Sequence, residues 1–170
     1  YRRAKVIFLV RDPRDVIVSH FHQITKRTKK PMYFSSISDF VRDETFGFNR
    51  IIQFYNLWYN QRKISKDFFL VKYEDLKNNG VNELKKIFNF LEINIEEKII
   101  REVYNKSSAT KMRNKELGNK LSGFNDFGKE INHLKVRKAK VGSYLDELSQ
   151  SDIDYCNFLL KKLQGFKYCK

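Results

Sequence analysis

The stretch that most constrains this chain is a run of five apolar residues, Val6 to Val10, followed at once by the charged segment RDPRD. A continuous apolar run rich in β-branched residues is typical of a strand that is buried on both faces of a parallel sheet. Asp12 suits the N-cap of a helix, Pro13 suits its first position, and Asp15 lies where the acid of a capping box would reach back. The stretch therefore predicts a strand, a sharp turn and a helix.

A second apolar run, Phe68 to Val71, predicts another strand, and helical patterns lie between the two runs. One pattern follows Pro13, and another extends from Phe48 to about Lys63. Strands that alternate with helices favour an α/β fold in which helices flank a central parallel sheet.

Helical patterns continue after the second strand. An amphipathic helix that begins near Asn82 is predicted by apolar residues at i, i+3, i+4 and i+7, namely Leu84, Ile87, Phe88 and Leu91. Gly165 suits a left-handed residue after the last helix. Two pairs resemble capping boxes that open further helices: Asn94 with Glu97, and Ser151 with Asp154.

The chain is strongly basic. Its 34 Lys and Arg residues against 20 Asp and Glu residues give a formal net charge of +14, which favours polyanions, phosphates, sulfates or anionic membrane surfaces as partners. Much of the excess lies between Lys106 and Lys140, a segment predicted to be a loop. Two cysteines, Cys156 and Cys169, form no CxxC pair, so neither a disulfide framework nor a metal site is expected. No apolar run is long enough to span a membrane.

Arg11 follows the first predicted strand and lies beside a predicted helix N-terminus. Ligands of open α/β sheets bind at this position, and a guanidinium there suits a bidentate phosphate. A structural ion pair with an acid close in sequence or in the fold is an equally good interpretation: Asp12, Asp15 or Glu74. Arg14, in contrast, is predicted to face solvent.

Two segments of the chain resemble the sulfotransferase family. The segment VIFLVRDPRDVIVSHFH resembles the part of those enzymes that binds the 3′-phosphate of the nucleotide, where a strand ends in an arginine and a serine follows on the next helix. Arg11 and Ser19 fall on those positions. The segment FFLVKYEDLKNNGVNELKKIFNFL resembles the family's next strand and helix, and Tyr73 matches the tyrosine that lies near the adenine.

Two later segments extend the resemblance. YNKSSATKMRNKE matches a nucleotide-binding segment in which Ser107 is the hydroxyl residue and Ala109 replaces the usual phenylalanine. VRKAKVGSYLDELSQSD resembles the Arg-Lys-Gly-x-x-Gly-Asp-Trp loop that closes over the 3′-phosphate, although Ala139 replaces the first glycine and Ser-Tyr replaces Asp-Trp. The resemblance thus assigns cofactor-binding roles to seven residues: Arg11, Ser19, Tyr73, Ser107, Arg137, Lys138 and Gly142.

The resemblance implies a partial P-loop-like three-layer α/β fold, a single domain over residues 1–170 that is truncated at its N-terminus, and a cytoplasmic location. It implies transfer of a sulfuryl group from 3′-phosphoadenosine 5′-phosphosulfate (PAPS) to a hydroxyl or amine of a small molecule or glycan, which leaves adenosine 3′,5′-bisphosphate (PAP), with no metal. The family's 5′-phosphosulfate loop and base precede the matched segments, so no catalytic residue is assigned. His20, His22 and His133 are predicted to be surface or packing residues, because none has an acid spaced to orient it.

Two other functions fit parts of the sequence. Nucleotide kinases share strand–turn–helix phosphate sites and similar layering, so a phosphotransferase fragment is one alternative. A basic module that grips nucleic acid through residues 106–140 is the other. Nucleic acid is not expected as the main ligand, because no RRM, KH, helix-turn-helix or zinc pattern is present.

Overall fold

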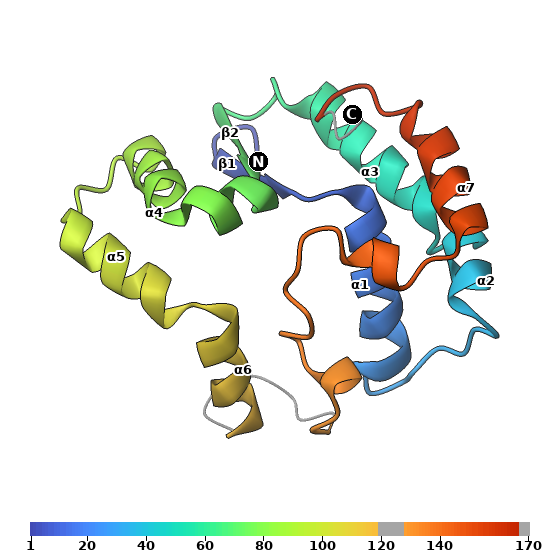
Figure 1. Ribbon diagram of the computed structural model, residues 1–170. Helices are drawn as coiled ribbons and strands as arrows, with labels where there is room; N and C mark the ends of the chain where they lie inside the picture. The colour runs from blue at the N-terminus through green and yellow to red at the C-terminus, as the bar shows by residue number, and fades with distance from the viewer. Residues whose placement is uncertain (119–127, 167–170) are drawn as a thin grey trace.

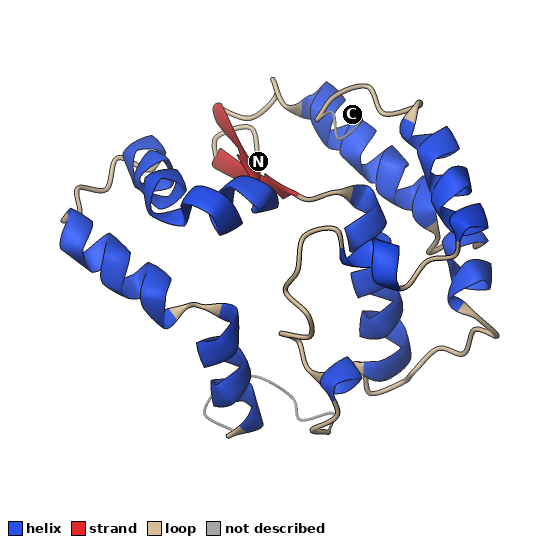
Figure 2. Cartoon of the chain, viewed as in Figure 1, coloured by secondary structure: helices blue, strands red, loops and turns tan. Residues whose placement is uncertain are grey.

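The computed structural model describes residues 1–118 and 128–166, which form an α/β fold in which two parallel strands lie between helices (Figures 1 and 2). The elements in chain order are β1 (Lys5–Val10), α1 (Pro13–Lys26), α2 (Ile37–Arg42), α3 (Phe48–Gln61), β2 (Asp67–Lys72), α4 (Tyr73–Phe90), α5 (Glu97–Lys106), α6 (Ala109–Leu117), the short 3-10 turns η1 (Ile131–His133) and η2 (Ser143–Asp146), and α7 (Gln150–Leu160). The parallel α/β architecture predicted from the sequence is confirmed.

Strands β1 and β2 pair in parallel, with Lys5 opposite Asp67 and Val10 opposite Lys72. On one face of the sheet, Phe8 stacks on Trp58 of α3 with ring centroids 5.1 Å apart. On the other face, Phe69 stacks on Phe90 of α4 at 5.3 Å. Helices therefore lie on both faces, which makes helix, sheet and helix layers.

The expectation that the first strand is buried on both faces is wrong for this chain. Val10 is fully buried, but Leu9 is 53% exposed and Ile7 is 38% exposed. The difference arises because α4 covers the second face only near Phe69 and Phe90, so the described helices leave part of that face open to solvent.

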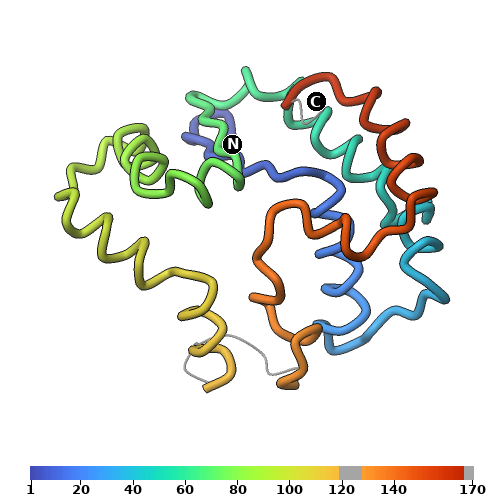
Figure 3. Tube along the Cα trace, in the orientation of Figure 1, coloured from blue at the N-terminus to red at the C-terminus, as the bar shows by residue number. Residues whose placement is uncertain are grey.

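The main core lies where α1, α2, α3 and α7 pack together. Its fully buried members include Ile17 of α1, Phe40 of α2 and Phe48 of α3, and Cys156 of α7 is equally buried. Helices α4, α5 and α6 lead away from this core, and the chain then returns so that residues of η1 and η2 lie along α1 (Figure 3). This return brings two segments more than 100 residues apart in sequence to one place.

Several predicted element boundaries are wrong. Helix α4 begins at Tyr73 and is kinked at Asn79, where φ is −141° and ψ is 45°, so the predicted start near Asn82 matches only the part of the helix after the kink. The segment predicted to be a loop contains α6. The pair Asn94–Glu97 forms no capping box, because the N-cap of α5 is Glu96 and makes no side-chain capping bond.

Helix α7 is capped by a different pair from the one predicted. Ser149 accepts from the Asp152 backbone, and the Asp152 side chain reaches back to the Ser149 backbone, two residues before Ser151–Asp154. Gly165 is not left-handed; Phe166 has that conformation, with φ of 57°. This position has no room for a side chain, because a Cβ on Gly165 would lie 2.1 Å from the Tyr59 ring.

Candidate anion-binding site

The site is built on the turn between β1 and α1. Asp12 caps α1 by accepting a hydrogen bond from the Arg14 backbone at 2.9 Å, and Pro13 occupies the first turn, as predicted. The backbone N–H of Asp12 donates to Glu74 of α4 at 3.0 Å. The acid that completes this cap therefore comes from α4, and the reach-back role predicted for Asp15 is wrong.

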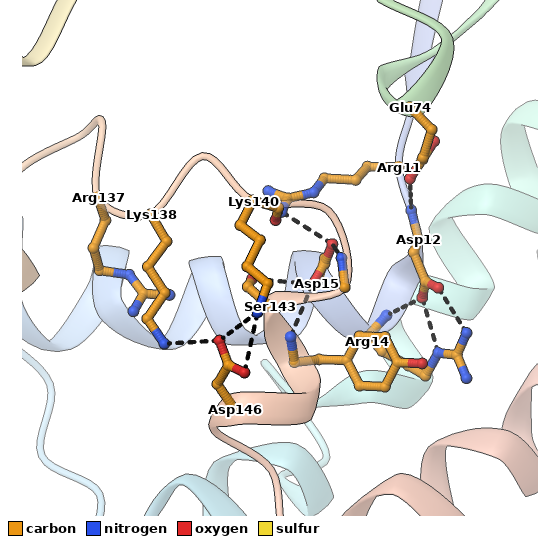
Figure 4. Close-up of polar contacts among 12 residues, drawn as sticks. Arg11, Asp12, Arg14, Asp15, Glu74, Arg137, Lys138, Lys140, Ser143 and Asp146 are labelled. Carbon is orange, nitrogen blue, oxygen red and sulfur yellow. Dashed lines mark hydrogen bonds and ion pairs between the residues drawn. The ribbon is translucent and has the colours of Figure 1, made fainter. Parts of the chain in front are cut away.

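Asp15 is buried and instead joins α1 to residues after Lys140 (Figure 4). Its Oδ1 accepts from the Ser143 hydroxyl at 3.1 Å and the Tyr144 N–H at 3.0 Å. Its Oδ2 accepts from the Gly142 N–H at 2.8 Å. Gly142 has φ of 76°, a conformation that glycine adopts without a steric penalty.

Arg11 leaves the end of β1 and lies between Asp15 and Tyr73. Its Nη2 donates to Asp15 Oδ2 at 3.0 Å and to the Lys140 carbonyl at 2.9 Å. Its guanidinium lies 4.6 Å from the centroid of the Tyr73 ring. The structural ion pair considered from the sequence is thus present with Asp15, and within the described part of the chain Arg11 Nε is buried without a hydrogen-bond partner.

Burial of Tyr73 raises the pKa of its hydroxyl above the ordinary value, although the nearby charge of Arg11 opposes the shift. Tyr55 of α3 holds the backbone of the same turn: its hydroxyl donates to the Arg11 carbonyl at 2.9 Å. Burial raises the pKa of Tyr55 to about 12. Both phenols are therefore neutral hydrogen-bonding groups near neutral pH.

A cavity of about 260 Å³ opens beside Arg11. Five of the seven predicted site residues line this cavity: Arg11, Ser19, Tyr73, Arg137 and Lys138. They come from distant parts of the chain, from the residue after β1 to the stretch before η2. Gly142 does not line the cavity but binds Asp15, which does. Ser107 is the C-cap of α5 and is not among the lining residues.

Glu147 holds two cations of residues 131–146, the returning segment that lies along α1. Arg137 Nη2 lies 2.7 Å and Lys138 Nζ lies 3.1 Å from Glu147 Oε1, and His22 Nε2 lies 2.8 Å from Oε2. Burial alone would raise the pKa of Glu147, but these three partners outweigh it and lower the pKa to about 2. The prediction that no acid orients a histidine is wrong for His22, because its partner lies 125 residues away in sequence.

The prediction that Arg14 faces solvent is wrong, because its side chain is largely buried. It binds the Asp12 carboxylate through Nε at 3.0 Å and Nη2 at 2.7 Å, and its guanidinium lies 4.3 Å from the Tyr144 ring centroid. The hydrogen bond with Asp12 raises its pKa above the ordinary value. Arg14 therefore supports the turn through Asp12 and is not among the residues that line the cavity.

Arg27, which no motif indicated, also lines the cavity. It is only 5% exposed and forms the C-cap of α1. A cation at a helix C-terminus is ordinarily interpreted as a partner of the helix dipole, so its position alone gave no signal of a site. Only the return of residues 134–138 along α1 shows that Arg27 faces other cations.

A second, more apolar cavity of about 460 Å³ adjoins the first, and Arg11 and Tyr73 line both. Of the aromatic residues between Lys26 and Phe48, Phe46 lines this cavity. Phe40 and Phe48 are buried in the core, and Tyr33 is exposed. An apolar molecule could thus lie next to an anionic group held at the first cavity.

The described residues contain no cluster of His, Cys, Asp and Glu side chains able to hold a metal ion. No helix formed by residues 1–118 or 128–166 has the length and apolar character needed to cross a bilayer. The fold and the cavity together define an α/β protein with a cationic cavity at the carboxyl end of a parallel strand, a position that binds anionic ligands in such folds.

Comparisons with known proteins identify the family. The sulfotransferase domain matches residues 1–166. Rat sulfotransferase 2A6 is 30% identical over 131 residues, which are 76% of this chain and 44% of that protein. Rat sulfotransferase 2A1 is 28% identical over 172 residues, covering 96% of this chain and 58% of that protein. The chain thus spans about half the length of these relatives, and it belongs to the sulfotransferase family.

Solved structures agree on the fold. Mouse sulfotransferase SULT7A1, complexed with PAP, superposes with a TM-score of 0.71 at 20% identity and covers 96% of this chain and 59% of its own. Retinol dehydratase, in complex with androsterone and PAP, gives a TM-score of 0.74 at 20% identity, with 98% and 49% covered. The P-loop-like fold expected from the resemblance is confirmed by these neighbours.

Proposed function

We propose that this chain binds PAPS and its product PAP, with the 3′-phosphate held in the 260 Å³ cavity, as part of a sulfotransferase that acts on a hydroxyl or amine. The observation that carries the proposal is the convergence of Arg11, Ser19, Tyr73, Arg137 and Lys138 on that cavity. These residues come from separate parts of the chain: the end of β1, α1, the start of α4 and the returning segment. A chance meeting of all five at one cavity is therefore a poor explanation.

Each side chain has a role consistent with its contacts. Arg11 and Arg137 would supply charge-assisted hydrogen bonds to phosphate oxygens, and Lys138 would add a point charge. Ser19 is exposed at the cavity and carries a hydroxyl donor. Tyr73, which lies against Arg11, would contact the base. These residues would bind and orient the donor, and none is assigned a proton transfer.

The proposed acceptor is a small molecule with an apolar body and a reactive hydroxyl or amine. The 460 Å³ cavity supports this class because its lining is largely apolar and it shares Arg11 and Tyr73 with the donor cavity. Androsterone and retinol occupy structures of retinol dehydratase, a fold neighbour of this chain. The proposal also treats residues 1–170 as one domain and keeps the cytoplasmic location that the resemblance implies.

The nucleic-acid alternative has less support from the contacts. Some cations of residues 106–140 outside the proposed donor site are already occupied: Arg113 binds the Val136 and Arg137 carbonyls, and Lys140 pairs with Asp146. Binding of arbitrary DNA or RNA with a steep salt dependence would favour this alternative. Preference for PAP over adenosine 5′-monophosphate would favour the donor site.

Substitution of Arg11 tests the proposal. We expect R11A to weaken PAP binding about 100-fold, because a phosphate would lose a charge-assisted bidentate partner, whereas the affinity for adenosine 5′-monophosphate changes little. Isothermal titration calorimetry measures both. R101A removes an arginine from the exposed surface of α5 and serves as the charge-matched control. Equal PAP affinities of wild type and a folded R11A would refute the assignment.

A further inference from the structure

Arg27 is one of the most deeply buried cations of the described chain, and its hydrogen bonds leave its charge unneutralised. Its Nη1 donates to the carbonyls of Leu134 at 3.2 Å and Lys135 at 3.3 Å, and its Nη2 donates to the Ser19 carbonyl at 2.9 Å. Carbonyl oxygens satisfy these N–H groups but carry no net charge. Its Nε is buried and has no partner among the residues that the structure describes.

The carboxylates around the cavity are committed to other cations. Asp15 pairs with Arg11, and Glu147 is shared by Arg137, Lys138 and His22. No carboxylate in residues 1–118 or 128–166 forms an ion pair with Arg27; Glu116, whose charge acts on it from farther away, accepts hydrogen bonds from the Lys135 and Val136 backbone. A buried charge without a direct ion-pair partner is unfavourable, so the free protein holds an incompletely balanced charge at this point.

Another buried cation, Arg137, lies close enough to Arg27 to repel it. Arg137 is 8% exposed and lines the same cavity. Burial lowers the pKa of Arg27, the like charge of Arg137 lowers it further, and the opposite charge of Glu116 offsets part of the shift. Two buried guanidinium groups that repel each other beside an open cavity form an arrangement that an anion would stabilise.

Arg11 shares these features with Arg27. Both side chains have a buried Nε without a partner in the described structure, and both line the 260 Å³ cavity. A neighbouring cavity of about 380 Å³ is also lined by Arg11, Ser19 and Arg27. Two arginines, each with a buried Nε that lacks a partner, therefore line the same cavity from opposite ends of α1.

We propose that Arg27 supplies the counter-charge that makes this cavity select a doubly charged phosphate monoester. This inference deepens the proposed function and rests on it for the identity of the nucleotide, but the phosphate itself can be tested separately. A merely structural role predicts something different, namely that Arg27 fastens the 134–135 backbone to α1 and has no effect on which ligand binds.

The first test measures inorganic phosphate binding by calorimetry in the full chain. R27Q removes the charge and keeps a polar side chain, R27K keeps the charge and loses the planar fork, and R101Q is the control for a lost surface charge. We expect R27Q to weaken phosphate binding at least tenfold, with R27K within about threefold of wild type and R101Q unchanged. Unchanged phosphate affinity in a folded R27Q would overturn the inference.

The second test uses nucleotides and separates this inference from the proposed function. R27Q should weaken PAP binding at least tenfold and leave adenosine 5′-monophosphate binding unchanged. Equal losses for both nucleotides would show a structural role and overturn the inference. A wild type that does not prefer PAP to adenosine 5′-monophosphate would refute the proposed donor site, while the phosphate titration would still decide the role of Arg27.

A spectroscopic measurement covers the case in which R27Q does not fold. The side-chain Nε–H resonance of Arg27 in the wild type is assigned by its loss in R27K, and inorganic phosphate is then added. We expect a saturable shift of this resonance, because Arg27 lines the cavity and a bound phosphate would change the electrostatic environment of its guanidinium. A resonance that stays in place while phosphate binds would overturn the proposal.

Discussion

Asp15 shows how one buried carboxylate organises a site without being a ligand. It accepts hydrogen bonds from Gly142, Ser143 and Tyr144 and pairs with Arg11. It therefore holds the returning segment against the end of β1 and orients the Arg11 guanidinium at the same time. The negative charge of Asp15 therefore stabilises the structure of a cavity whose other charged lining residues are cations.

We expect D15N to lower the free energy of unfolding by about 2–3 kcal/mol, because hydrogen bonds to a charged acceptor are stronger than those to an amide and the amide N–H₂ would face donors. Chemical denaturation measures the change, and limited proteolysis should show faster cleavage within residues 134–142. D154N changes an exposed acid of α7 and should stay within about 0.5 kcal/mol of wild type. A D15N protein as stable as this control would contradict the role given to Asp15.

Among the helices, the absence of a side chain at Gly80 lets α4 and α5 pack closely. A Cβ on Gly80 of α4 would lie 2.0 Å from Cε2 of Tyr104 on α5, and the Tyr104 hydroxyl lies 3.3 Å and 3.2 Å from the Leu76 and Lys77 carbonyls. The Tyr104 ring thus lies directly on the α4 backbone. This contact anchors α5, which leads the chain toward the returning segment.

We predict that G80A destabilises the chain by roughly 1–2 kcal/mol, since overpacking against the ring outweighs the better helix propensity of alanine. Thermal or chemical denaturation gives the value. The exposed variant N78A, on the same helix, should be close to neutral. In a Y104A background the same G80A change should become neutral or stabilising, and persistence of the penalty there would exclude the ring contact as its cause.

Across the whole molecule, two carboxylates, Glu147 and the buried Asp152, join segments that are distant in sequence. Glu147 links the returning segment to α1 through His22. Asp152 of α7 binds Arg42 and accepts from the Ser38 hydroxyl at 2.6 Å, both on α2. Burial opposes ionisation of Asp152, but its hydrogen bonds from Arg42, Ser38 and Ser149 outweigh burial and lower its pKa to about 2.

These pKa shifts predict an acid-sensitive fold. A carboxylate whose pKa is depressed in the folded state stabilises the fold above its unfolded pKa, and this stabilisation is lost as pH falls through the folded pKa. We therefore expect the free energy of unfolding to fall between about pH 4.5 and pH 2. E147Q and D152N should each flatten this part of the profile, whereas E130Q, at an exposed position, should not. An unchanged slope in both variants would contradict the assignment.

Local patterns in the sequence were sufficient for much of the architecture. The apolar runs identified both strands, and the Asp12–Pro13 pair identified the start of α1, because strand propensity and helix capping depend on residues close in sequence. The exact caps of α5 and α7 were missed, since several Ser, Asn and acidic residues compete at each end and packing decides which is used. The kink at Asn79 has no local signal in the sequence.

Residues close in sequence were enough to predict the α/β class and the strand–turn–helix at Arg11, and the family resemblance marked Ser19, Tyr73, Arg137 and Lys138. The long-range contacts emerge only on folding: Asp15 and Glu147 hold the returning segment, His22 gains an acid partner, and Arg27 lines the cavity. The two sets of features differ in the distance along the chain over which they act. Capping and periodicity act over a few residues, whereas charge pairing and burial depend on segments that folding brings together across more than 100 residues.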